Sequence, residues 1–265
     1  AASELGPDGK PRVKEKYAPY FKVVTLPDAT TTTTSESAKT GGDRPPDKQF
    51  LLEYGQPDRV YRNEGVDAAG RPRFKDVTAG SGLDGVFGQG LSAAIWDANG
   101  DGRPDIYVAN DYSDVDHLWI NLGPGPEGAL RFRDATDEHL PYTTWFSMGS
   151  DVADVDGDGL LDLMVADMAA TTHYKAKTTM GDMDGYRRWV MENGWPRQLM
   201  RNTLFLATRA GRYRECAFQA EVARSDWTWS VKFGDYDLDR RPDVFITNGV
   251  PRSFSDSDIA VTPAM

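Results

Sequence analysis

The chain of 265 residues is long enough for one all-β domain or two smaller ones, and its 39% hydrophobic and 11% aromatic content indicates a folded protein. The net charge of −11 argues against nucleic acid as a partner, because nucleic acid binding requires a basic patch. The single cysteine, Cys216, excludes an internal disulfide and a CxxC-type zinc cluster, and no apolar run approaches the roughly 18 residues that span a bilayer.

Residues 1–48 are predicted to form an N-terminal segment. A strand is expected at residues 20–24, and residues 30–48 are low in complexity, which predicts an exposed loop or linker. Repeats occupy residues 49–250, and residues 251–265 are interpreted as a truncated C-terminal segment. Because the chain begins at Ala1 without a methionine, we expect it to be a piece of a longer protein, so the missing signal peptide says little about export.

An acidic loop occurs three times and is the most informative motif. Residues 154–162 read DVDGDGLLD, with oxygen ligands at positions one, three, five and nine and a glycine at position six. Ca²⁺ binds several carboxylate oxygens around one such sharp turn, together with the backbone carbonyl at position seven. The predicted metal ligands, with position seven contributing its carbonyl, are Asp97, Asn99, Asp101, Arg103, Asp105, Asp154, Asp156, Asp158, Leu160, Asp162, Asp235, Asp237, Asp239, Arg241 and Asp243.

An acidic loop of this kind has two other interpretations. An acidic hairpin turn without an ion would leave four aspartates in nine residues to repel one another. An EF-hand requires a glutamate at position twelve, where this chain has Val108, Val165 and Ile246. The sequence therefore favours a calcium site. Ligand charge and the glycine at position six together predict the highest Ca²⁺ affinity for the middle loop and the lowest for the third loop, which has Arg240 at position six.

Short apolar runs flank each loop and predict strands. The runs after the loops are residues 106–109, 163–166 and 244–247, and those before them are residues 91–95, 149–152 and 231–233. A second motif, RFKDVT at residues 73–78, recurs as RFRDAT at 131–136 and RYRECA at 212–217, each time 22 or 23 residues ahead of the next acidic loop when counted from its aromatic residue. A further strand precedes each copy, at residues 60–62, 118–120 and 203–206.

Each repeat thus consists of four antiparallel strands in about 57 residues, the make-up of one β-propeller blade. The fold class predicted is all-β, a β-propeller with a possibly incomplete ring; a β-sandwich is the competing fold, but it needs no such repeat. The second spacing between loops is 81 residues, which places an insertion at residues 168–201 with a short helix expected at 186–192. We expect the tryptophans on or beside the strands to fill the space between blades: Trp96, Trp119, Trp227 and Trp229.

These motifs resemble the FG-GAP/VCBS repeat family, the Ca²⁺-binding blades of integrin α-subunit propellers. Within that family, the runs DVDGDGLLDLMVADM and WSVKFGDYDLDRRPDVFITNG are similar to the ASPIC/UnbV group, related to cartilage acidic protein. The resemblance covers about residues 49–249 and implies Ca²⁺ as the cofactor. It also implies about seven blades, of which this chain holds three recognisable units.

The functional hypothesis is a non-catalytic, calcium-binding propeller that binds a protein or glycan ligand, located extracellularly, in the periplasm or at the cell surface, because millimolar calcium suits loops of this kind. His117, His139 and His173 lie in no nucleophile or metal motif, and Cys216 aligns with Val77 and Ala135 as a small core residue. The alternative is a carbohydrate-active lyase or hydrolase, since such enzymes need only carboxylates.

Overall fold

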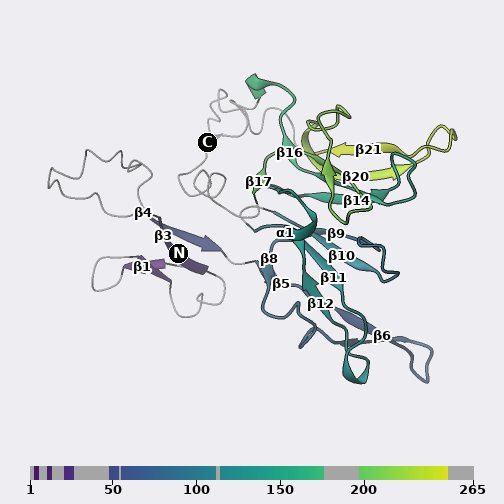
Figure 1. Ribbon diagram of the computed structural model, residues 1–265. Coiled ribbons are helices and arrows are strands. Elements are labelled where there is room, and N and C mark those ends of the chain that lie inside the picture. The colour runs from purple at the N-terminus through teal and green to yellow at the C-terminus, as the bar shows by residue number, and fades with distance from the viewer. Residues whose placement is uncertain are drawn as a thin grey trace.

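The computed structural model describes residues 3–5, 11–13, 21–26, 48–53, 55–111, 114–175 and 197–249, which are mostly antiparallel strands (Figure 1). Near the N-terminus, β1 (Ser3–Leu5) pairs with β2 (Pro11–Val13), and β3 (Phe21–Leu26) pairs with β4 (Lys48–Glu53). The strand predicted at residues 20–24 corresponds to β3. The helix predicted at 186–192 and the segment 251–265 lie outside the described residues.

Two four-stranded sheets carry the first two acidic loops. The first sheet has the order β12-β11-β10-β9. Its strands are β9 (Gly90–Trp96), β10 (Asp105–Asn110), β11 (His117–Asn121) and β12 (Phe132–Asp134). The second has the order β14-β15-β18-β19. Its strands are β14 (Gly149–Ala153), β15 (Asp162–Ala166), β18 (Thr203–Leu206) and β19 (Arg214–Glu215).

Partial sheets lie before and after these two. β6 (Tyr61–Val66) and β7 (Pro72–Asp76) form a hairpin, and β5 (Gln56–Pro57) pairs with β8 (Phe87–Gly88). The third acidic loop joins β20 (Asp226–Gly234) to β21 (Asp243–Asn248), with β16 (Met168–Ala169) on the other side of β20. The connections contain η3 (Pro126–Gly128), α1 (Thr136–His139) and β13 (Thr143–Thr144), which pairs in parallel with β17 (Gln198–Leu199). The strands predicted around each loop are therefore present.

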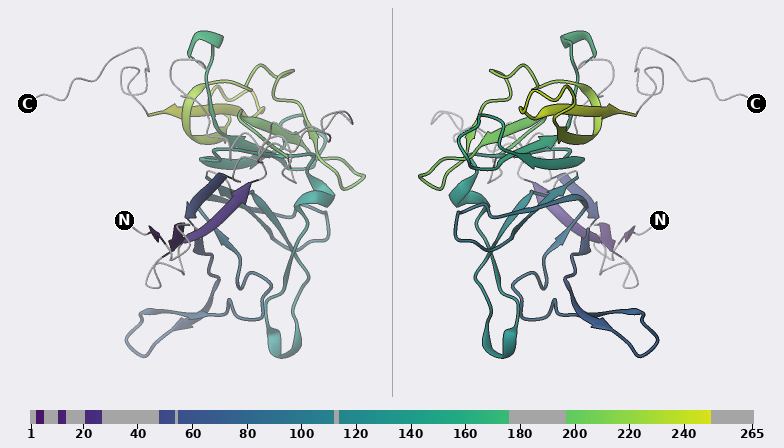
Figure 2. Two further views of the ribbon diagram at one scale, coloured as in Figure 1. Left: turned by 90° about the vertical axis from the view of Figure 1, so that its left-hand side faces the viewer. Right: turned by 90° about the vertical axis from the view of Figure 1, so that its right-hand side faces the viewer.

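The successive sheets face one another, so that β20, β14 and β9 lie one below the other (Figures 1 and 2). These are the strands that precede the acidic loops. Ser92 on β9 and Ser150 on β14 place their hydroxyl oxygens 3.0 Å apart, and the backbone N–H of Phe233 on β20 donates to Asp151 on β14 at 2.8 Å. Antiparallel sheets that contact through their first strands are consistent with β-propeller blades, and the predicted fold class is confirmed at this level.

Apolar side chains fill the space between adjacent sheets. Trp96, Tyr107 and Leu118 of the first sheet pack with Leu163 and Phe205 of the second, and all five are buried. A second cluster joins the second sheet to Val231 of β20 and includes Cys216, which is buried as predicted. Burial of this apolar area is the main contribution that holds one blade against the next.

The tryptophan prediction is wrong in one case. Trp96 and Trp119 are 4% and 3% exposed, and Trp227 is partly buried, whereas Trp229 is 45% exposed. The register between β20 and β21 shifts between Thr228 and Ser230, so that Trp229 falls at an irregularity in the ladder. A residue displaced from the ladder in this way no longer follows the alternation that would direct its side chain into the core.

The RFxD motif, present in the first two of the three copies, ends an outer strand and binds it to the strand before it. In the first blade, Asp134 accepts the backbone N–H of Thr136 at 3.0 Å and its hydroxyl at 2.7 Å, and the Thr136 hydroxyl accepts the N–H of Leu118 at 2.8 Å. Asp76 and Thr78 make the same contacts around the N–H of Val60. The motif therefore has a structural role at the outer edge of these two sheets.

Candidate metal centre

All three acidic loops occupy the same place in their sheets. Each joins the first strand of a repeat to the second: residues 97–105 link β9 to β10, residues 154–162 link β14 to β15, and residues 235–243 link β20 to β21. Because both flanking strands belong to one antiparallel ladder, the two ends of each loop are fixed. The loop itself then decides where the carboxylates point.

The first aspartate of each loop organises the turn through backbone hydrogen bonds. Asp154 accepts the N–H groups of Gly157, Asp158 and Gly159 at 2.8, 3.0 and 2.9 Å. Asp97 makes the same three contacts in the first loop, and Asp235 accepts two N–H groups in the third. Such aspartate-to-backbone bonds bend the chain locally, so the turn is preformed.

Two positions in each loop adopt a left-handed backbone conformation, where the sequence predicted one. In the middle loop these are Gly157 and Gly159, with φ of 76° and 88°. The third loop has Leu238 and Arg240 at these positions, with φ of 64° and 73°. The structure therefore adds position four to the predicted requirement at position six, and it shows that the third loop has the same shape without glycine. The third loop therefore keeps this conformation without glycine but is less stable for it.

The last aspartate of each loop connects the turn to its sheet. Asp162 is 1% exposed and accepts the N–H groups of Val155 and Ala207, both at 2.8 Å. Loss of solvation raises the pKa of Asp162, and the backbone donors oppose that shift. Asp105 is buried in the same way and accepts the N–H groups of Ala98 and Asn121. Since a carboxylate accepts several contacts, these bonds leave acceptor capacity for a cation.

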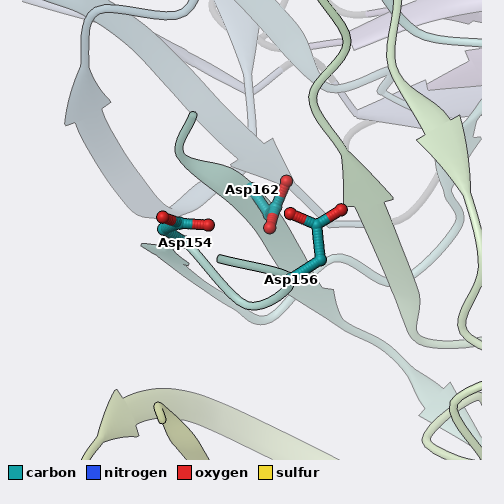
Figure 3. A group of neighbouring side chains, drawn as sticks. All are labelled: Asp154, Asp156 and Asp162. Carbon is teal, nitrogen blue, oxygen red and sulfur yellow. The ribbon is translucent and has the colours of Figure 1, made fainter. Parts of the chain in front are cut away.

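The middle loop brings three of its predicted ligands together. Asp154, Asp156 and Asp162 each offer a carboxylate oxygen within 4.8 Å of the others, and Figure 3 shows their carboxylates gathered above the turn. Asp158 accepts the N–H of Leu160 at 2.9 Å and lies outside this group. The predicted ligands therefore share one small region, with Asp158 at its edge.

The other two loops differ from the middle one. In the third loop, Asp235, Asp237 and Asp239 form a group of the same dimensions, while Asp243 accepts the N–H of Tyr236 at 2.9 Å. In the first loop, Asn99 stands at position three and donates from its amide to Asp101 at 2.9 Å. Hard oxygen donors around a tight turn are the set that Ca²⁺ prefers, so the residues present fit this ion best in the middle loop.

Arginines neutralise carboxylates in two of the loops. Arg103 forms an ion pair with Asp101, and Arg241 forms one with Asp239 at 3.0 Å. In the middle loop position seven is Leu160, and the nearby Arg209 donates to the backbone carbonyl of Asp158 at 3.5 Å. Within the described parts of the chain, no lysine or arginine forms an ion pair with the middle-loop aspartates. The middle loop therefore carries the least compensated negative charge.

A second pair of acids, which the sequence did not predict, lies at the opposite end of the strands. Asp116 and Asp167 are fully buried. Asp116 accepts hydrogen bonds from the hydroxyls of Tyr107 and Ser147 at 2.5 and 2.9 Å, and Asp167 accepts the N–H of Trp145 at 2.8 Å. The two carboxylates therefore hold the segment that leads from the first blade to the second.

Burial raises the pKa of Asp116 to about 6 and that of Asp167 to about 7, because the charged form loses its hydration. The folded state therefore binds more protons than the unfolded state between about pH 4 and pH 7. Stability from these groups is present at low pH and decreases as the pH rises through this window. Asn110 and Asn248 occupy the positions that correspond to Asp167 in the other two repeats.

The histidines occupy separate places in the described structure. His117 contacts Asp134 through Nδ1 at 2.7 Å, and His139 contacts the carbonyl of Gly211 through its own Nδ1. His173 is exposed. The pKa of the Cys216 thiol is raised, mainly by burial, which makes the thiolate less available.

Residues 97–165 match the FG-GAP-like repeat family. The matched stretch runs from the first acidic loop through the second and into β15, so it contains the two loops and the strands between them. It confirms the predicted family resemblance over these residues; the ASPIC/UnbV subgroup stays a prediction. No curated protein matches the chain. Among the described residues, no helix has the length and apolar character needed to cross a membrane.

Proposed function

We propose that the chain is a calcium-binding FG-GAP propeller module in which Ca²⁺ occupies the acidic loops and fixes the turns at one end of the blades. The observation that supports this most directly is the group formed by Asp154, Asp156 and Asp162, with oxygens within 4.8 Å of one another and no compensating cation among the described residues. Like charges at this separation repel one another, and a divalent cation removes that repulsion.

We further propose that the module is non-catalytic and that it binds a protein or a glycan outside the cytoplasm. Preformed loops with modest ligand numbers suit the millimolar calcium concentrations of extracellular fluids. The similarity of DVDGDGLLDLMVADM to the ASPIC/UnbV group supports an assignment to that group as part of this proposal.

The metal assignment is tested by calorimetric titration of the folded chain with CaCl₂, with Asp156→Ala as the variant of the middle loop. Asp156 lies at position three and, among the described residues, accepts only the N–H of Asp158, at 3.2 Å, so its removal disturbs the turn less than removal of Asp154 would. We expect millimolar or tighter binding by the wild type and loss of one site in the variant. Absence of calcium binding at millimolar concentration would contradict the proposal.

Partner binding is tested separately from metal binding. A glycan array and a protein pull-down, each run with calcium and with chelator, should reveal a ligand whose retention depends on calcium. A hydrolysis and lyase assay on any bound glycan completes the test. Turnover of that glycan would contradict the non-catalytic assignment and leave the calcium assignment intact.

A further inference from the structure

We propose that Arg103 is a built-in counter-cation of the first acidic loop, which weakens Ca²⁺ binding there and makes the first loop the weakest and the middle loop the tightest of the three sites. This inference rests on the proposed calcium function and concerns its regulation. It also changes the order expected from sequence, because it places the first loop, and not the third, as the weakest site.

Arg103 is held at two points. Its guanidinium pairs with Asp101 through Nη2, and its Nε donates to the backbone carbonyl of Asn121 at 2.8 Å. Asn121 is itself bound to the loop, because its N–H donates to Asp105 at 2.7 Å and its amide donates to the carbonyl of Pro104 at 3.0 Å. The positive charge therefore lies against position five of the loop, fixed by the neighbouring strand β11.

Asp101 has a second donor on the same oxygen. The amide nitrogen of Asn99 lies 2.9 Å from Oδ2 of Asp101, the atom that Arg103 also contacts. A calcium ion that used this oxygen would have to displace both donors. It would also approach a unit positive charge, and at about 6 Å in water this repulsion lowers the affinity for a divalent cation by about tenfold.

The middle loop provides the contrast within the same chain. Its position seven is Leu160, its position three is Asp156 instead of an amide, and Arg209 reaches only the backbone carbonyl of Asp158. The third loop lies between these cases. Arg241 pairs with Asp239, but its side chain is 83% exposed, compared with 42% for Arg103, and an exposed arginine is screened and easily moved aside.

The experiment exchanges position seven between the first and middle loops of the full chain. Arg103→Leu is titrated with CaCl₂ in a background in which Asp156→Ala and Asp237→Ala weaken the other two loops, so that the heat reports the first loop. Leu160→Arg is titrated in the corresponding background with Asn99→Ala and Asp237→Ala. Arg209→Leu serves as the matched control, because this arginine lies near a loop without contacting its carboxylates.

We expect Arg103→Leu to tighten Ca²⁺ binding at the first loop by about tenfold and Leu160→Arg to weaken it at the middle loop by a similar factor. The affinity of the Arg209→Leu variant should stay within about twofold of that of the same chain without this substitution. Both effects should shrink as NaCl is raised, because the groups are partly exposed. Unchanged affinity in both exchanged variants overturns the inference while the calcium function stands. If the wild type binds no calcium at any loop, the proposed function and the inference both fail. Leu160→Arg keeps the test decisive if Arg103→Leu does not fold.

Discussion

The left-handed conformation of Arg240 predicts that a glycine at this position stabilises the protein. Arg240 has a φ of 73°, a region in which a side chain costs about 1 to 2 kcal/mol per residue. Gly102 and Gly159 occupy the same position in the other two loops. Glycine also increases the entropy of the unfolded chain, which offsets about 0.4 to 1 kcal/mol of this relief. The net gain from Arg240→Gly should be about 0.5 to 1 kcal/mol.

Leu238→Gly relieves the same strain at position four. Leu238 has a φ of 64° and is 84% exposed, so its removal sacrifices little buried area. The two substitutions together should add about 1 to 2 kcal/mol, which corresponds to a rise in melting temperature of roughly 2 to 8 °C for a domain of this size. Urea unfolding followed by circular dichroism, with chelator present, measures the effect without a contribution from calcium.

The neighbouring arginine and the matching glycine are the controls. Arg241 does not have a positive φ, so Arg241→Gly should be neutral or destabilising. At Gly159, with φ of 88°, an added Cβ meets no atom within 4 Å, so the cost of Gly159→Ala is conformational alone, about 1 kcal/mol. If Arg240→Gly left the stability unchanged or lowered it, as Arg241→Gly should, the argument from backbone strain would be refuted.

Three further predictions concern the spaces between and within blades. Asp167→Asn should raise the free energy of unfolding at pH 8 by about 1 to 4 kcal/mol and have little effect at pH 4, because it removes a buried carboxyl group whose pKa is about 7 in the folded state. Equal effects at both pH values would exclude this cause. Gly149→Ala should cost about 1 to 3 kcal/mol in chemical unfolding, since its Cβ would lie 2.8 Å from the Cα of Ser230, and a neutral result would mean that the blades separate easily. Trp119→Ala should cost about 3 to 5 kcal/mol in the same assay and Trp229→Ala much less, an order that burial alone requires.

The local features of this protein could be predicted from its sequence. The acidic loops are turns of nine residues, and the hydrogen bonds by which their aspartates accept N–H groups of the same loop join positions at most seven residues apart. The flanking strands follow from short apolar runs, and the RFxD motif closes its own blade edge. Repetition then identified the blades, because two landmarks kept the same spacing in each unit. The structure of a segment can be predicted from its sequence when the pattern is both local and repeated.

The sequence also contains an indication of the second left-handed position in each loop. Gly100 and Gly157 stand at position four of two loops, and the alignment with Leu238 could have indicated a second left-handed position. The arginines at position seven were also visible. Their effect on the carboxylates was not, because a side chain can turn toward or away from its own loop, and the contact of Arg103 with Asn121 in β11 decides its direction.

The tertiary structure alone decided the remaining features. Asp116 and Asp167 became a buried pair because the first and second blades enclose the segment between them, and the donors to their carboxylates lie up to 31 residues away in sequence. The exposure of Trp229 followed from a register shift between two strands. Burial and register depend on which distant segments meet, so composition and spacing fixed the loops and the blades, while packing set the charge, exposure and pKa of individual residues.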